Sequence, residues 1–75
     1  MVDPAEIERL LVAALPGARV EIVDLTGGRD HYQIRVVAEA FRGCPKMRQH
    51  RMVYAALGEL MRGDIHALSL STEPG

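Results

Sequence analysis

The sequence is poor in the features that mark several classes of protein. It has no tryptophan, and aromatic residues make up 4% of it, so few rings are present to stack on single-stranded nucleic acid. Its one cysteine, Cys44, has no second cysteine with which to form an intrachain disulfide, as is usual for a chain from a reducing compartment. The net charge of −1 excludes the overall positive field that dominates nonspecific binding of nucleic acid.

Long apolar runs are also absent. No run approaches the roughly 20 residues that a membrane-spanning helix needs. The N-terminal segment carries Asp3, Glu6 and Glu8, which are not typical of a signal peptide. We therefore expect a cytoplasmic chain that does not contact a membrane.

The length limits what the chain can build. With 75 residues it is long enough for one domain and too short for two, so residues 1–75 are expected to form a single domain. In so small a domain the burial of apolar surface barely exceeds the entropy lost on ordering the chain. A deep pocket that excludes water is difficult to build on such a core. We therefore expect a protein that binds a partner and is not an enzyme.

Apolar residues at helical spacing predict two helices. The first is expected to begin at Asp3-Pro4, because Asp is a good N-cap and Pro fits the first helical position, and to stop at Pro16-Gly17. The second is expected to begin near Pro45 and to end at Gly63, a natural C-cap, with a short extra turn near 44–47. Gly58 within it costs about 1 kcal/mol relative to alanine, which favours close packing there. The residues expected to form its core-facing stripe are Met47, Val53, Tyr54, Leu57, Leu60 and Met61.

Short β-branched stretches with alternating side chains predict strands at residues 19–24, 31–37 and 65–71. A turn over residues 26–30 joins the first two into an antiparallel hairpin. The long helix joins the second strand to the third, and such a right-handed crossover joins parallel strands. The expected fold is an α/β (α+β) domain of order α-β-β-α-β, with a mixed three-stranded sheet, helices packed on one face, and a polar end after the last strand.

This topology brings two histidines toward the same end of the sheet. His31 opens the second expected strand and His66 lies at the start of the third. Because neighbouring strands lie about 4.8 Å apart, both imidazoles could face one small ligand at this end of the sheet. Imidazole is a common metal ligand, but two ligands do not complete a tetrahedral site, so a metal here would be shared with another molecule. The alternative is that both are surface residues at strand ends. The alternation along the two strands also differs, because it places His66 on the core face and His31 on the outer face.

Basic residues gather around the start of the long helix. Lys46, Arg48 and Arg51 lie mostly off its apolar stripe, and Arg42 is close by in the sequence. Such a cluster fits either a solvated helix face or contact with phosphates or an acidic partner surface. His50 lies on the edge of the stripe, where it is expected to be partly buried and to hold a loop, with a contact or ligand role as the alternative.

Several stretches of the sequence, taken together, resemble the BolA family. The Phe-x-Gly, His-Arg-x-Val-Tyr and His-Ala-Leu stretches, in this order and spacing, are specific as a set. Gln49 departs from the pattern, because arginine is commoner there, and removes one positive charge. The resemblance implies a KH-like (type II) fold with a helix-turn-helix-like segment. The matching stretches are Val20-Glu21-Ile22, Asp24, His31-Tyr32-Gln33, Val36-Val37, Phe41-x-Gly43, Gln49-His50-Arg51-Met52-Val53-Tyr54 and His66-Ala67-Leu68.

The resemblance also implies a function. Family members pair with monothiol glutaredoxins around a bridging [2Fe-2S] cluster, to which a partner cysteine and a glutathione supply thiolates. His66 matches the usual BolA-side ligand, and His31 matches the second, for which members use His or Cys. Cys44 stays open as an alternative second ligand. The implied role is iron–sulfur trafficking or iron sensing, and a weak homodimer of the free chain stays open.

The family is also described as transcriptional regulators, so DNA binding through the helix-turn-helix-like segment is the alternative function. KH domains hold nucleic acid with a Gly-x-x-Gly loop, and the stretch Gly43-Cys44-Pro45-Lys46 lacks the second glycine. RNA recognition by that route is therefore not expected. A thiol reductase built on Cys44 would need a resolving cysteine, which the sequence lacks.

Overall fold

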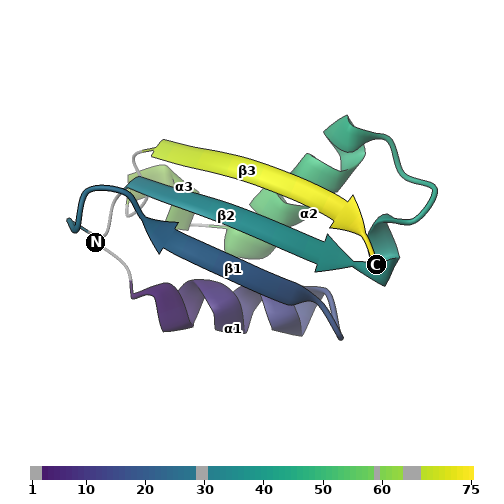
Figure 1. Cartoon of the computed structure of the whole chain (residues 1–75), viewed down its shortest axis with the longest axis horizontal. Helices are drawn as coiled ribbons and strands as arrows, with labels where there is room; N and C mark the ends of the chain where they lie inside the picture. Colours follow the sequence, from purple (N-terminus) through teal and green to yellow (C-terminus); the bar gives the residue numbers. More distant parts are fainter. Residues whose placement is uncertain (1–2, 29–30, 59, 64–66) are drawn as a thin grey trace.

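The computed structural model describes residues 3–28, 31–58, 60–63 and 67–75. Figure 1 shows three strands side by side, with the two longer helices behind them on one side. The α/β class, the mixed sheet and the one-sided packing predicted from the sequence are therefore confirmed. In chain order the elements are α1 (Pro4–Ala14), β1 (Arg19–Asp24), β2 (His31–Ala38), the 3-10 turn η1 (Glu39–Phe41), α2 (Lys46–Leu57), α3 (Leu60–Gly63) and β3 (Ala67–Pro74).

β2 is the central strand of the sheet, which has the order β1-β2-β3. It pairs antiparallel with β1, with Arg19 opposite Val37. It pairs parallel with β3, with His31 opposite Ala67. A parallel pair needs a crossover connection, which η1, α2 and α3 supply here. The hairpin and the crossover both follow the prediction.

The core lies between the sheet and the helices. Burial alternates along β2, because every second side chain of a strand points to the same face. α1 begins as predicted: the Asp3 carboxylate accepts a 2.9 Å hydrogen bond from the N–H of Ala5, and Pro4 is the first helical residue. The buried apolar residues are Ile7, Leu11, Leu15, Tyr32, Ile34, Val36, Ala38, Phe41, Val53 and Leu57.

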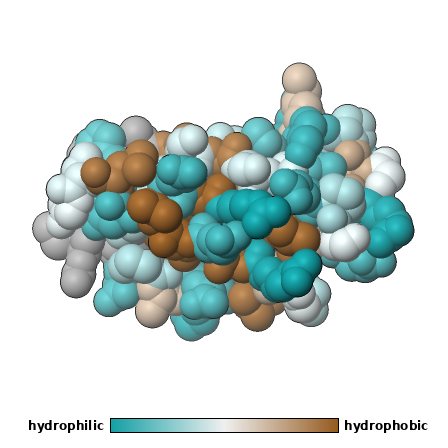
Figure 2. All heavy atoms as spheres, in the orientation of Figure 1, coloured by the Kyte–Doolittle hydropathy of each residue, from teal (hydrophilic) through white to brown (hydrophobic). Residues whose placement is uncertain are grey.

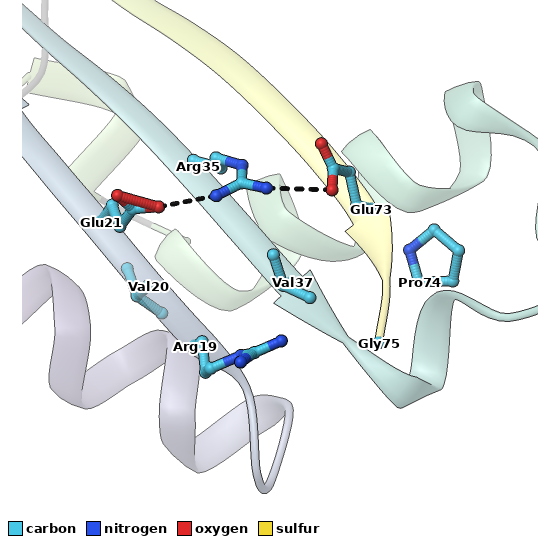
Figure 3. A pocket seen from close by; sticks show the side chains of 8 residues that line it. All are labelled: Arg19, Val20, Glu21, Arg35, Val37, Glu73, Pro74 and Gly75. Carbon is cyan, nitrogen blue, oxygen red and sulfur yellow. Dashed lines mark hydrogen bonds and ion pairs between the residues drawn. The ribbon is translucent and has the colours of Figure 1, made fainter.

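The opposite face of the sheet, turned to the viewer in Figure 1, carries none of the described helices. Arg35 on β2 donates hydrogen bonds to Glu21 on β1 at 2.8 Å and to Glu73 on β3 at 3.0 Å, as Figure 3 shows. These two hydrogen bonds raise the pKa of Arg35 above its ordinary value, and the bond to Glu21 has the larger effect. Figure 2 shows hydrophilic residues over the middle of this face. A hollow of about 490 Å³ beside the pairs is lined by Arg19, Val20, Glu21, Arg35, Val37, Glu73, Pro74 and Gly75.

The predicted long second helix is two helices in the structure. α2 ends at Leu57, and Gly58 takes φ 54° and ψ −121°, a conformation that glycine adopts and other residues avoid. The N–H of Gly58 donates to the C=O of Tyr54 at 2.9 Å and so caps the helix. The prediction that Gly58 lies inside a continuous helix was wrong.

The buried face of α2 also differs from the prediction. Its buried residues are Gln49, Val53 and Leu57. Met47 and Tyr54, which the sequence placed in the core, are 68% and 40% exposed. The apolar stripe was therefore assigned correctly at Val53 and Leu57 and wrongly at the two exposed residues.

Two other boundaries differ. The extra turn predicted near 44–47 occurs earlier, as η1 at Glu39–Phe41. β3 continues to Pro74, so the predicted polar end is part of the strand, where Thr72 is buried. Residues 65 and 66 of the predicted third strand lie outside the described residues. Within the described part of the chain, no helix has the length and apolar character to cross a membrane.

Candidate functional site

His31 stands where the β1–β2 hairpin re-enters the sheet. The turn before it is held by the Asp24 carboxylate, which accepts hydrogen bonds from the N–H of Gly27 at 3.0 Å and of Thr26 at 3.3 Å. The N–H of Leu25 donates to the C=O of His31 at 2.8 Å. These bonds fix the backbone of His31 at the first position of β2, and its side chain is half-buried there.

The parallel pairing places the start of β3 beside His31. Ala67, the first residue of β3, is the Cα partner of His31. Neighbouring strands are about 4.8 Å apart, so the two residues are close neighbours. Ala67 follows His66 in the sequence, but His66 itself lies outside the described residues. The strand arrangement that a His31–His66 pair requires is present, and the pair itself stays a prediction.

The face on which His31 lies follows from the alternation of β2. Tyr32, the next residue, is fully buried, whereas Gln33 and Arg35 are exposed. His31 shares their phase and therefore lies on the face that carries none of the described helices, as predicted. Among the described residues, no group of three or more His, Cys, Asp or Glu side chains is arranged to hold a metal ion.

Cys44 lies toward the other end of β2. It follows η1, which begins directly after Ala38, the last residue of the strand. The eight residues of β2 span about 23 Å from the first to the last. The thiol of Cys44 is half-buried and donates to the C=O of Ala40 at 3.6 Å. The structure therefore does not bring Cys44 and His31 together.

The five residues predicted to contact a partner or nucleic acid occupy different settings. Arg42 donates to the Glu39 carboxylate at 3.2 Å and to the C=O of Gly75 at 3.1 Å. Lys46 donates from Nζ to the C=O of Thr72. Both cations are thus held within the chain.

The other three candidates lie on α2. His50 is half-buried, in the setting predicted for it. Arg48 and Arg51 are exposed, and neither forms an ion pair with another residue that the structure describes. Their guanidinium groups are therefore the members of the cluster best able to reach a second molecule.

A buried polar link, which the sequence did not reveal, joins this segment to the sheet. Gln49 is 4% exposed. Its Nε2 donates to the C=O of Cys44 at 2.8 Å and to the C=O of Phe41 at 3.3 Å, while its Oε1 accepts a 2.7 Å bond from the hydroxyl of Thr72. Gln49 has the helical phase of Val53 and Leu57, and this spacing was the one signal of its burial.

Comparisons with known proteins agree with this geometry. Residues 13–74 match the family described as BolA-like protein. The chain is 39% identical over 71 residues to Protein BOLA2 of Arabidopsis thaliana, covering 93% of this chain and 75% of that protein. It is 33% identical over 73 residues to the DNA-binding transcriptional regulator BolA of Escherichia coli (strain K12), covering 88% of this chain and 70% of that one.

The fold is shared with solved structures. BolA1 from Arabidopsis thaliana matches with a TM-score of 0.87 over 99% of this chain and 94% of that one, at 23% identity. At this identity, structural similarity shows a shared fold. Membership of a family is shown by the match over residues 13–74 and by the sequence relatives above. The resemblance found in the sequence motifs is therefore confirmed, and the chain belongs to the BolA-like protein family.

Proposed function

We propose that this protein is a partner of monothiol glutaredoxins and shares with them a glutathione-ligated [2Fe-2S] cluster, for iron–sulfur trafficking or iron sensing. The observation that carries the proposal is the pairing of His31 with Ala67, the residue that follows His66 in the sequence. A cytoplasmic location, and the absence of a catalytic activity of its own, belong to the same proposal.

The chemistry of the donor set fits such a cluster. Imidazole replaces thiolate on one iron of some [2Fe-2S] centres and raises their reduction potential. His31 and His66 would hold one iron, and the thiolates of glutaredoxin and glutathione would hold the other. When bound, the cluster supplies one-electron chemistry and a transferable iron–sulfur unit.

The position of His31 supports a shared site. It is the first residue of the central strand β2 and lies on the face that carries none of the described helices, so a partner has access from that side. The position of Cys44 beyond the far end of β2 favours His31 over Cys44 as the second ligand.

Co-expression with a monothiol glutaredoxin in the presence of glutathione tests the proposal. We expect a coloured heterodimer whose visible circular dichroism changes in His66→Ala and in His31→Ala. His50→Ala removes a half-buried imidazole on α2 and is the matched control, which we expect to leave the spectrum unchanged. Cys44→Ser is expected to behave like the control. An unaltered spectrum in both ligand variants contradicts the ligand assignment, and the absence of a heterodimer contradicts the function.

DNA binding is the second candidate function. The Escherichia coli relative carries the name DNA-binding transcriptional regulator. In this chain, Arg48 and Arg51 on α2 are exposed and have no carboxylate partner among the described residues. Arginines in this setting suit contact with phosphates, which positions a protein on DNA without reading its sequence.

A further inference from the structure

One face of α2 mixes apolar and basic side chains and is exposed. Met47, Arg51 and Tyr54 have the spacing i, i+4, i+7 and therefore lie on one side of the helix, with Arg48 and Ala55 along its border. Met47 is 68% exposed and Tyr54 is 40% exposed. We call these five residues the α2 stripe. It lies away from the side of the helix that buries Gln49, Val53 and Leu57.

The charges of the α2 stripe are not balanced by its own helix. Residues 46–57 include no Asp or Glu. Three exposed arginines elsewhere in the chain have carboxylate partners: Arg9 pairs with Glu6, Arg35 with Glu21 and Arg42 with Glu39. Two others, Arg19 and Arg62, form no ion pair with a described residue. Arg48 and Arg51 lack such partners in the part of the chain that the structure describes. The stripe therefore carries positive charge on a protein whose net charge is −1.

The composition of the α2 stripe is that of a protein-binding surface. Tyr, Met and Arg are enriched at the centres of protein–protein interfaces, whereas Lys, Glu and Asp are depleted there. Tyr and Arg are also the residues whose truncation most often weakens binding. The flexible thioether of Met47 adapts to different apolar partners.

From these observations we infer that the α2 stripe binds an acidic, amphipathic helical segment of another protein. The carboxylates of such a segment neutralise Arg48 and Arg51, and its apolar side chains pack against Met47 and Tyr54. A DNA backbone would satisfy the arginines but would leave Met47 and Tyr54 without an apolar partner. Charge and apolar character together therefore select a protein segment.

The size of the α2 stripe sets the strength of this contact. From Met47 to Tyr54 it extends about 10 Å along the helix, at about 1.5 Å per residue. A partner helix of two to three turns covers this length. So small a contact belongs to the weak, transient class of interfaces.

This inference goes beyond the glutaredoxin proposal and does not depend on it. The α2 stripe lies on a helix behind the sheet, whereas His31 lies on the face of the sheet turned away from the helices. A segment bound at the stripe therefore leaves the start of β2 at His31 accessible. Loss of one binding activity need not change the other.

Fluorescence anisotropy with two labelled peptides tests the inference. Both peptides are about 16 residues long, roughly four helical turns, with leucines at helical spacing, and their other positions are glutamate in one and lysine in the other. We expect the glutamate peptide to bind and the lysine peptide not to bind. The double variant Met47→Ser/Tyr54→Ser and the double variant Arg48→Ser/Arg51→Ser each weaken binding by about tenfold.

Two control variants distinguish binding at the α2 stripe from nonspecific binding to exposed apolar or charged residues. Val23→Ser removes an exposed apolar residue from β1, and Arg19→Gln removes an exposed charge from the same strand. Both should leave the affinity unchanged, and far-UV circular dichroism should show that every variant is folded. Amide shifts of the labelled protein in NMR should move at residues 47–55 on addition of the glutamate peptide.

Four results would overturn the inference. These are no binding of the glutamate peptide, equal binding of both peptides, equal affinity of the serine variants and the wild type, and binding of duplex DNA that weakens when Met47 and Tyr54 are replaced.

Discussion

The hydroxyl of Thr72, on β3, donates a 2.7 Å hydrogen bond to the side-chain oxygen of Gln49, on α2, and both residues are buried. Through its amide nitrogen, Gln49 also holds the backbone of Phe41 and Cys44. One side chain therefore connects the last strand to the segment that precedes α2. This segment carries Arg42, and α2 carries the other basic candidates, so the link fixes the basic surface relative to the sheet.

Replacement of Gln49 by alanine should lower the free energy of unfolding by about 1–3 kcal/mol, because a buried hydroxyl and a buried carbonyl lose their partners. Urea unfolding followed by circular dichroism measures the change. Gln33→Ala is the matched control: Gln33 is exposed on β2, and its loss should change stability by less than about 0.5 kcal/mol.

The partner residue gives a second measurement of the same link. Thr72→Val keeps the shape of the side chain and removes its hydroxyl. Because the two side chains share a hydrogen bond, the stability losses of Gln49→Ala and Thr72→Val should not be additive, with a coupling of about 0.5–3 kcal/mol. Strict additivity would show that the two side chains act independently.

Gly58→Ala should destabilise the protein by about 1–3 kcal/mol, because φ 54° with ψ −121° is strained for a residue with a Cβ. The nearest atom to an added Cβ is the carbonyl oxygen of Ala55 at 3.8 Å, so a steric clash does not contribute. In a continuous helix the same change would stabilise by about 1 kcal/mol. The sign of the effect in thermal unfolding therefore distinguishes a helix that ends at Leu57 from one that continues.

The two faces of α2 should respond differently to truncation. Leu57→Ala removes buried methyl groups and should cost about 2–5 kcal/mol, which is enough to unfold much of so small a domain. Met47→Ala removes a side chain that is 68% exposed and should change stability by less than about 0.5 kcal/mol. Chemical denaturation of the two variants checks this difference, and a large effect of Met47→Ala would mean that the residue is in the core.

Much of the fold could be predicted because periodicity and breakers act locally. Neighbouring residues are enough to predict the alternating burial of Tyr32, Ile34 and Val36. The same holds for the end of the first helix before Pro16-Gly17. The burial of Gln49 could not be found in this way. Two of its hydrogen-bond partners are backbone carbonyls, of Phe41 and Cys44, and the third is the hydroxyl of Thr72, which is distant in the sequence. Gly58 was misread because a glycine inside a helix and one at its end have the same local pattern.

The candidate site could be predicted in part. The start of β2 at His31 and the parallel pairing of β2 with β3 were both predicted, whereas the register that places Ala67 opposite His31 was not. The separation of Cys44 from His31 depends on the length of β2 and on the position of η1, which the sequence placed later in the chain. The ion pairs of Arg35 also required the register of all three strands, so their partners were not available from the sequence.

The carboxyl of Glu6 should titrate below its usual pKa of 4.5, because the hydrogen bond from Arg9 stabilises its charged form. A lowered pKa in the folded state gives stability that is present above the unfolded pKa and is lost as the pH falls through the folded value. Arg9→Gln should raise the pKa of Glu6 and remove this dependence in acid. NMR titration of the Glu6 side chain measures both, and Arg19→Gln, a change on β1, should leave that pKa unaltered.

If the protein also binds DNA, the affinity should depend on salt in proportion to the number of phosphate contacts. Each contact contributes about −0.9 to the slope of log K against log salt concentration. Arg48→Ala/Arg51→Ala removes two exposed cations of α2 and should reduce the slope by up to about two units, whereas Arg19→Ala on β1 should not change it. Electrophoretic or anisotropy titrations of a short duplex at several salt concentrations give the slopes. A wild-type protein without salt-dependent affinity at physiological ionic strength would exclude this function, because a DNA contact made through arginines must release counterions.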